Sequence, residues 1–454
     1  MLPIRLISCY TLDSDFRLGI NMVKVLPFRG LRYSVDHVTR DLSGVICPPY
    51  DVISLDEQYK LRGSLSSYNS INLELPEGDT EKRYDDAKSR LISWQTLGIL
   101  KRDSTPKYYL LSHQFKFDQK SIERWGLTAA VRLEDYREGL VLPHEETGLA
   151  AKEDRFSLMK ACEANLSPIM SLFRDEESKF KELRNTYTRK KYPDYFFDMG
   201  EGPSYETFAM WAVEGKEIEG IVDQLFDGKP LFIADGHHRY ETAMRYKEWL
   251  QSQAEYWAED SAANFVMMTL IEFDDPGLMI LPYHRTLGHI STDSYIKLKE
   301  GLLEVFEVIP SSTPITSGRE LESMVQASEG VVIGIHDAMD SAYLLRLRDD
   351  FSPDELSELP ERDTLGKHGA WVLQQILEQQ IGDQVEKLEY SHDPEEVWDS
   401  VVYGHKVMGF YLNAFPLDLF ESIVSMGSKL PRKSTYFHPK LPTGMVFNLL
   451  SGKL

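Results

Sequence analysis

Apolar residues recur along this chain with two spacings, and each spacing predicts a different kind of element. One stretch predicts an amphipathic helix because its apolar residues fall three or four apart, namely Tyr84, Ala87, Leu91 and Trp94 within Glu81–Leu100. Short apolar runs bounded by polar residues predict strands. The predicted strands are Lys107–Phe117, Leu127–Tyr136, Phe208–Gly215, Lys229–Ala234, Ala263–Phe273, Val331–Asp337, Ala342–Asp349 and Lys406–Phe415, and the further predicted helices are Glu177–Thr186, Asp293–Val305 and His368–Ile381. Both patterns alternate, so we expect a mixed α/β fold.

The length of 454 residues exceeds what one small core can organise, so two or three packed subdomains are expected. We expect residues 1–21 to form an N-terminal extension, because Met22 opens a cleaner segment. The expected division continues with an N-terminal α/β region over 22–110, a core over 111–300 and a C-terminal α/β region over 301–454.

Charge and cysteine content narrow the function classes. A net charge of −22 argues against nucleic acid as the main partner, because phosphate backbones need a positive field. The three cysteines, Cys9, Cys47 and Cys162, are far apart and form no CxxC pair, which favours a reducing cytoplasm over a disulfide framework or zinc ribbon. No apolar run approaches the roughly 20 residues that a membrane span needs.

The stretch LFIADGHHRYETAMRY, Leu231 to Tyr246, combines a strand end with unusual polar residues. Asp235 and Gly236 supply a tight turn after an apolar run, and a helical pattern follows, so a helix is predicted to begin near His237. The first backbone N–H groups of a helix are unpaired and bind anions, and the adjacent histidines and Arg239 reinforce such a site. This junction therefore predicts a phosphate cradle.

Two other interpretations of this junction stay open. Asp235 could be a simple helix cap with both histidines solvated, although a cap explains the aspartate and not the three residues after it. Zinc is the other alternative, but His237 and His238 at one helix start point about 100° apart, so one helix cannot easily use both as ligands.

Two further segments carry concentrated polar chemistry. The first is PHEET at Pro143–Thr147, where a rigid turn after a strand would present a carboxylate; its alternative is a solvated charged loop within Val141–Arg155. The second is KLPRKSTYFHPKLPTG at Lys429–Gly444, whose cations and hydroxyls predict an anion cradle, with a basic surface loop as the alternative. Walker, complete dinucleotide, GxSxG and HExxH signatures are missing.

In this order, PHE, DGHHR and the late Pro/Lys/Ser/Thr-rich segment resemble the free serine kinases of archaea, which belong to the ParB–sulfiredoxin superfamily. The longer pattern PFRGLRY, PPYDVI, LPHEETG, IADGHHRYETA and PRKSTYFHPKLPTG is similar to a widespread bacterial and archaeal family of uncharacterised proteins over Met22–Leu454. The resemblance implies a ParB/sulfiredoxin-like core with additional N-terminal and C-terminal α/β subdomains. A sulfiredoxin-like activity is disfavoured because no cysteine lies in the motif, and a ParB-like activity because of the negative charge.

The same resemblance implies roles for individual residues. Glu145 would be the general base, and Asp235 would hold Mg²⁺ or Mn²⁺ and take part in catalysis with His238. The residues that would bind the donor phosphates or nucleotide are Gly236, His237, His238, Arg239, Lys433, Ser434, Thr435 and His438. The candidates for substrate binding are His144, Glu146 and Arg155.

The resemblance implies transfer of a phosphoryl group from ATP, ADP or pyrophosphate to free L-serine, giving O-phosphoserine. A non-catalytic nucleotide sensor would keep the cradle without needing Glu145, and a phosphatase or nuclease could use the same carboxylates on water. We expect no nucleic-acid or membrane partner, and the sequence leaves the oligomeric state open.

Overall fold

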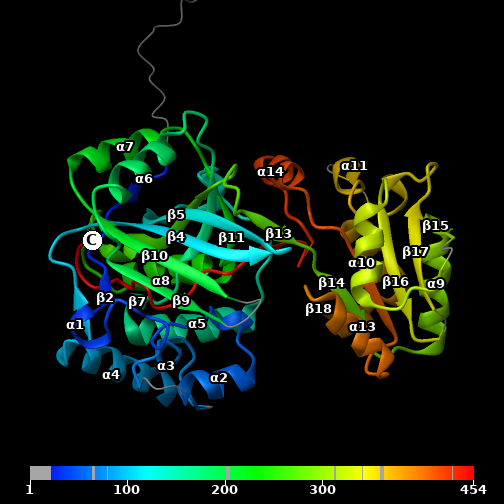
Figure 1. Cartoon of the computed structure of the whole chain (residues 1–454), viewed down its shortest axis with the longest axis horizontal. Coiled ribbons are helices and arrows are strands. Elements are labelled where there is room, and N and C mark those ends of the chain that lie inside the picture. Colours follow the sequence, from blue (N-terminus) through cyan, green and yellow to red (C-terminus); the bar gives the residue numbers. More distant parts are fainter. Residues whose placement is uncertain are drawn as a thin grey trace, which may run out of the picture.

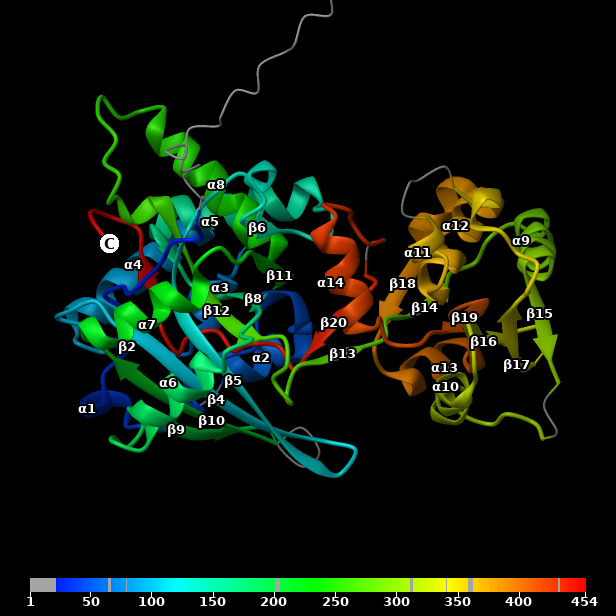
Figure 2. The ribbon, with the colours of Figure 1, turned by 90° about the horizontal axis from the view of Figure 1, so that it is seen from above.

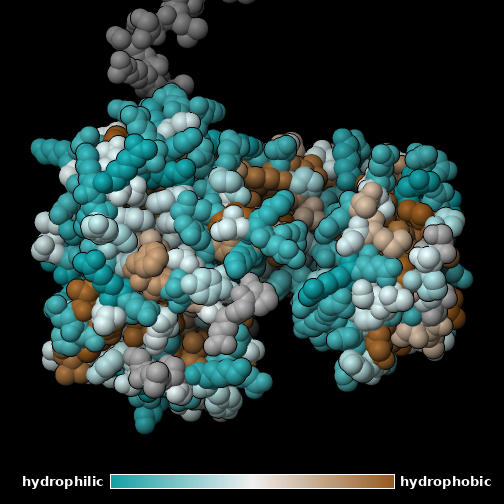
Figure 3. Space-filling model, viewed as in Figure 1, coloured by the Kyte–Doolittle hydropathy of each residue, from teal (hydrophilic) through white to brown (hydrophobic). Residues whose placement is uncertain are grey.

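The computed structural model describes residues 22–63, 67–78, 80–200, 205–310, 313–339, 341–357, 362–431 and 433–454, with the side chains of 149–151 excepted. The expected extension at 1–21 and Arg432 of the late basic segment lie outside the described residues. Two bodies, each built around one large sheet, lie side by side (Figure 1), and a hollow separates them on one face of the surface (Figure 3).

The larger body contains a nine-stranded sheet in which two strand pairs are parallel, β6 with β11 and β8 with β12, and the others are antiparallel. Its strands in spatial order are β6 (Val141–Leu142), β11 (Leu231–Asp235), β8 (Ile169–Phe173), β12 (Phe265–Glu272), β5 (Lys120–Arg132), β4 (Tyr108–Phe117), β10 (Glu206–Val213) and β9 (Tyr195–Met199), with β1 (Val25–Leu26) paired to β5.

Both faces of this sheet are buried. Along β4, Tyr108 and Leu110 belong to one apolar cluster, and Tyr109 and Leu111 belong to another, as alternation in a strand requires. The helices of this body are α1 (Val35–Val38), α2 (Leu55–Arg62), α3 (Ile71–Glu74), α4 (Lys82–Thr96), α5 (Leu149–Cys162), α6 (Lys179–Thr188), α7 (Lys216–Phe226), α8 (His237–Gln251) and α14 (Leu417–Ser425).

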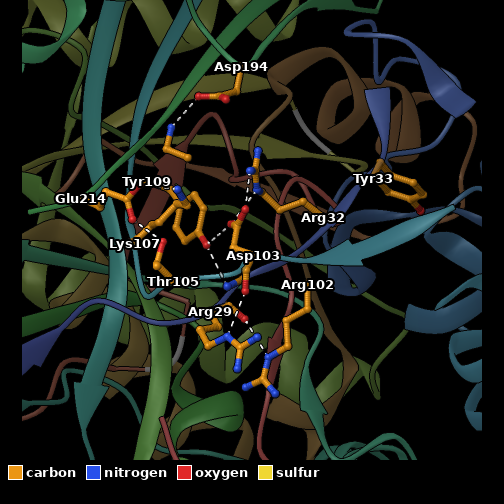
Figure 4. Close-up of polar contacts among 12 residues, drawn as sticks. Arg29, Arg32, Tyr33, Arg102, Asp103, Thr105, Lys107, Tyr109, Asp194 and Glu214 are labelled. Carbon is orange, nitrogen blue, oxygen red and sulfur yellow. Dashed lines mark hydrogen bonds and ion pairs between the residues drawn. The ribbon is translucent and has the colours of Figure 1, made fainter. Parts of the chain in front are cut away.

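A polar network fixes the two-stranded sheet of β2 (Leu31–Tyr33) and β3 (Leu100–Arg102) against β4. Arg32 donates to both carboxylate oxygens of Asp103, at 2.6 and 2.9 Å, and the Tyr109 hydroxyl donates to the same carboxylate at 2.7 Å (Figure 4). A guanidinium that donates to both oxygens of one carboxylate orients both groups, so this strand pair is held in one register.

The smaller body contains a six-stranded, wholly antiparallel sheet covered by helices on both faces (Figure 2). Its strands in spatial order are β15 (Phe306–Ile309), β17 (Ala342–Leu347), β16 (Val332–Asp337), β19 (Met408–Tyr411), β14 (His284–Leu287) and β18 (Leu388–Ser391). Its helices are α9 (Thr292–Val305), α11 (Arg362–Leu365) and α12 (Gly369–Ile381) on one face and α10 (Gly318–Ala327) and α13 (Pro394–Val402) on the other.

The chain enters the smaller body after β13 (Met279–Leu281) and returns through β20 (Tyr436–His438), and these two strands pair with each other. After the return, β21 (Asn448–Leu449) pairs with β7 (Ala164–Asn165) in the larger body. The expected divisions after residues 110 and 300 lie inside β4 and α9, and a division into independent units stays a prediction.

The mixed α/β class is confirmed, and so is the face of α4, whose buried residues are Tyr84, Ala87, Leu91 and Trp94. The strand expected at Leu127–Tyr136 begins earlier and ends at Arg132 as part of β5. A charged loop throughout Val141–Arg155 is wrong, because α5 begins at Leu149 and buries Phe156 among its apolar contacts. None of the helices in the described ranges combines the length and apolar character that crossing a membrane requires.

Candidate functional site

The PHEET motif and the DGHHR motif lie close together because they follow neighbouring parallel strands. β6 and β11 run side by side with Val141 opposite Leu231, so the loops after them emerge at the same edge of the sheet. The loop after β6 carries His144 and Glu145, and the loop after β11 leads into α8. In parallel α/β sheets, ligands bind beyond the carboxyl ends of the strands, and this local parallel pair offers the same kind of edge.

The start of α8 presents unpaired backbone N–H groups. The N-cap is Gly236, with φ of 98° and no side-chain cap, and the first helical bond runs from the Tyr240 N–H to the Gly236 carbonyl at 3.0 Å. The N–H groups of residues 237–239 have no acceptor within the described ranges. The predicted helix start near His237 is confirmed, whereas the interpretation of Asp235 as the cap is wrong.

Glycine is favoured at position 236 for two reasons. Its positive φ disfavours other residues, and an added Cβ would lie 2.9 Å from Nε of Arg239. The absence of a side chain therefore lets the Arg239 guanidinium fold back over the turn.

Asp235 is held between two cations. Arg239 donates to one carboxylate oxygen at 2.5 Å, and Lys440 contacts the other oxygen. Burial by itself would raise the pKa of Asp235, but Lys440 and Arg239 together hold it below its usual value. Asp235 is thus ionised, and both of its oxygens are in use.

His144 is buried and has a defined tautomer. Its Nδ1 lies 2.7 Å from the Ile233 carbonyl, which can only accept, so Nδ1 carries the proton. Nε2 then accepts from the Thr435 hydroxyl at 2.9 Å. Burial lowers the pKa of His144, although Glu145 opposes that shift, so the ring is neutral at pH 7. The ring links the strand edge to the returning C-terminal segment.

Glu145 is half-buried and oriented by the same returning segment. Its Oε1 accepts the backbone N–H of Lys433 at 2.9 Å, and Lys433 adopts a positive φ of 57°. No side chain or backbone group in the described ranges bonds to the other oxygen. A carboxylate with one fixed and one open oxygen can accept a proton from a nearby hydroxyl.

His144, Glu145 and His237 form the metal-compatible group in the described part of the chain, with ligand atoms within 4.8 Å of one another. The backbone N–H of His144 donates to Nε2 of His237 at 3.2 Å. The sequence argument against zinc concerned adjacent histidines, whereas the structure pairs His237 with a histidine from another segment. Asp235 could hold Mg²⁺ only if Lys440 moved away, so metal binding there stays a prediction.

His238 points toward the start of α5, where its Nε2 accepts the Gly148 N–H at 3.0 Å. Burial lowers the pKa of His238, with Glu241 and Glu145 opposing the shift. The backbone N–H of His238 is one of the unpaired groups at the start of α8. Its ring holds the end of the loop that carries Glu145 through the bond from Gly148.

The structure does not bring every predicted residue to this edge. Arg155 is buried and held by Asp154 and Glu74, and Glu146 is exposed and lies 3.7 Å from Lys429. The hydroxyl of Ser434 donates to the Pro431 carbonyl. Their proposed binding roles stay predictions.

His438 belongs to a second polar cluster. Arg124 donates to the carbonyls of His438 and Pro439 and to Nδ1 of His113, so Nε2 of His113 donates to Glu206 at 2.8 Å. Burial lowers the pKa of His438 to about 4 and raises the pKa of Glu206 to about 7.

Sequence reasoning missed two residues beside the site. Lys440 was one of several cations in the basic segment, and nothing local singled it out as the partner of Asp235. Tyr283 lies under the Lys433 ammonium, 5.2 Å from ring centroid to Nζ, and no motif marked it.

A family model described as DUF1015, a protein of unknown function, matches residues 25–372. No curated protein matches the sequence significantly. None of these matches bears on the ParB–sulfiredoxin placement, which stays a prediction.

Some solved structures are similar at low identity. A free serine kinase variant in complex with AMP is 12% identical, covering 68% of this chain and 90% of that chain with a TM-score of 0.35. SbnI with a C-terminal truncation, from Staphylococcus aureus, is 11% identical, with 72% and 84% covered and a TM-score of 0.35. A conserved hypothetical protein from Pyrococcus furiosus is 12% identical, with 68% and 93% covered and a TM-score of 0.33. Likenesses at such scores carry no argument about activity.

Proposed function

This chain belongs to the DUF1015 family, and we propose that it transfers a phosphoryl group from ATP, ADP or pyrophosphate to the hydroxyl of free L-serine. The observation that carries the proposal is the placement of Glu145. Its carboxylate is fixed by Lys433, and its ligand atom lies within 4.8 Å of that of His237, at the start of α8. The ordered motif resemblance supports serine as the acceptor.

In the proposed reaction Glu145 accepts the proton of the serine hydroxyl. The serine oxygen then forms a bond to the terminal phosphorus, and the bond from that phosphorus to the rest of the donor breaks. The remaining nucleotide or phosphate leaves with the electron pair. Phosphoryl transfer depends mainly on positioning and charge neutralisation, so one oriented carboxylate beside a cationic cradle is sufficient protein chemistry.

Charge neutralisation comes from three sources at the sheet edge. The unpaired N–H groups of α8 attract anions, and Arg239 and Lys440 supply positive charge. A donor phosphate arriving here would compete with Asp235 for Lys440. Mg²⁺ or Mn²⁺ bound to the donor would add shielding, but Asp235 as it stands fits such an ion poorly, because cations occupy both oxygens.

The test uses the purified full chain with labelled serine and, separately, ATP, ADP and pyrophosphate, each with and without Mg²⁺ or Mn²⁺. O-phosphoserine in one of these reactions supports the proposal and identifies the donor. Glu145→Gln should slow formation of the product about 10²-fold to 10⁴-fold. The matched control is Glu153→Gln, because Glu153 is an exposed residue of α5 paired with Arg245.

Donor binding without O-phosphoserine would favour the sensor. Release of inorganic phosphate from the donor without O-phosphoserine would favour a phosphatase. Either result would overturn the kinase proposal.

A further inference from the structure

Arg285, on β14 of the smaller body, is a fully buried arginine that lacks a charged partner. Its side chain has 0% exposure, and its Nη1 donates to the amide oxygen of Gln374 at 2.8 Å. Its Nε and Nη2 are buried with no hydrogen-bond partner, and no carboxylate in the described ranges lies within ion-pair distance. Burial lowers the pKa of Arg285 to about 10, so it remains charged at pH 7.

An unpaired buried charge is strongly unfavourable, so such a group needs an explanation. Arg124 in the larger body is the natural comparison, because it is 1% exposed and its pKa is also lowered to about 10 by burial. Arg124, however, donates to two backbone carbonyls and to His113. Arg285 has a single amide oxygen.

The guanidinium of Arg285 lies directly behind the wall of a groove between the two bodies. It donates to Gln374 and lies over the ring of Tyr390, 5.8 Å from Cζ to the centroid, and both of these residues line the groove. The groove has a volume of ≈ 850 Å³. Its opposite wall includes Glu146, Lys429 and Lys433, next to Glu145.

We propose that Arg285 is the floor of an anion-binding site, and that a small molecule in the groove places a carboxylate or phosphate group against Nη1, in place of the Gln374 amide, and against the neighbouring unpaired Nη2. A planar anion matches this fork of two neighbouring donors. Gln374 is suited to this exchange, because its other end already donates to Glu378 at 2.7 Å.

The ligand is an anion because no internal counter-charge takes that place. Glu378, the nearest carboxylate acting on Arg285, is exposed and reaches it only through the Gln374 amide. His368 is also close, but burial lowers its pKa to about 4, so it is neutral and cannot serve as a cation or an anion at pH 7. The inference does not require phosphoryl transfer at Glu145.

The test measures binding of inorganic phosphate and, separately, succinate to the full chain by calorimetry and by melting temperature, against sodium chloride at equal ionic strength. Three variants separate the binding sites: Arg285→Met removes the proposed site, Lys440→Met removes a cation at the start of α8, and Arg124→Met is the comparison with a hydrogen-bonded buried arginine. We expect Arg285→Met to bind the preferred anion about 10-fold to 100-fold more weakly, because a charged hydrogen-bonded contact is lost. The two probes distinguish a phosphate ligand from a carboxylate ligand.

Lys440→Met should remove only anion binding at the start of α8 and leave the Arg285 component intact, so the two sites fail independently. Without anion, Arg285→Met should melt at or above the wild-type temperature, whereas Arg124→Met should melt lower. Gln374→Ala removes the side chain that covers Arg285 and accepts its one hydrogen bond, so this variant should bind the anion at least as tightly as wild type. Equal anion binding by wild type and Arg285→Met, or no binding by either protein (a buried water only), would overturn the proposal.

Discussion

The two bodies accommodate buried arginines in opposite ways. In the larger body each deeply placed guanidinium discussed above has strong acceptors: Arg32 has Asp103, Arg239 has Asp235, and Arg124 has two carbonyls and a histidine. In the smaller body Arg285 has one neutral amide. A buried cation with acceptors inside the protein stabilises the fold without a ligand. A buried cation without such acceptors is balanced only when an anion binds.

The difference also assigns separate tasks to the two bodies. The paired groups of the larger body fix the geometry of the edge that carries Glu145. The smaller body supplies a groove wall whose buried charge is not satisfied within the described ranges. The following predictions test whether these tasks are separable.

The largest expected effect is on turnover. Glu145→Gln keeps the size of the side chain and can still accept from Lys433, but it removes the proton acceptor. We expect O-phosphoserine formation to fall about 10²-fold to 10⁴-fold. Steady-state kinetics measure this rate, and anion binding at Arg285 should be unchanged. Wild-type turnover in the variant would remove Glu145 from the reaction.

Removing the counter-charge of the paired cluster should strongly destabilise the larger body. Asp235→Asn leaves Lys440 and Arg239 without their carboxylate, and breaking a buried pair on one side costs about 3–5 kcal/mol. Urea unfolding measures the loss. Adding Lys440→Met to the variant should recover part of it, and a double variant no more stable than Asp235→Asn would contradict the pairing.

Glu206 gives a pH-dependent prediction. Its pKa in the folded protein is raised to about 7, above the ordinary 4.5, so the folded state binds this proton more tightly than the unfolded state. Its stabilising contribution is complete below about pH 4.5 and is lost as the pH rises through 7.

Between pH 5 and 8 the wild type should therefore lose about 1–3 kcal/mol more than Glu206→Gln. Urea titrations of both proteins at each pH provide the comparison. Parallel pH profiles for the two proteins would show that Glu206 does not titrate in this range.

The smallest expected effect is the loss of stability when a helix cap is removed, and this loss should be equal in both bodies. Ser54 caps α2 of the larger body, and Ser317 caps α10 of the smaller body, each by accepting a backbone N–H. Replacing either serine with alanine should cost about 1 kcal/mol. Thermal unfolding of the two variants checks this. A large inequality would mean that the bodies differ in more than their buried charges.

The sequence predicted what is encoded locally. The face of α4 and the start of α8 follow from side-chain spacing and from the Asp235–Gly236 turn, and both are confirmed. The helix α5 was missed because the charged run Lys152–Arg155 hides the apolar residues that follow, of which Phe156 and Met159 are buried.

Nonlocal pairing could not be predicted from spacing. Asp235 and Lys440 are 205 residues apart, and no local sequence pattern around either residue identifies the other as its partner. The same holds for Glu145 and the Lys433 backbone. Arg285 was missed for a different reason, because a lone arginine in a short strand carries no sign of whether a carboxylate will face it.

The pairing of β13 with β20 has a consequence for biosynthesis. A ribosome makes Asp235 and then the entire smaller body before it reaches Lys440, and domains generally begin to fold as they emerge. All nine strands of the larger sheet precede Phe273 in the chain, but Lys440 and the partner strand of β13 come after the smaller body. While the smaller body is completed, Asp235 therefore has Arg239 alone as its cation, and β13 has no partner strand. During that interval the nascent protein exposes an open strand edge, so we expect a folding helper to be needed most at this stage of synthesis.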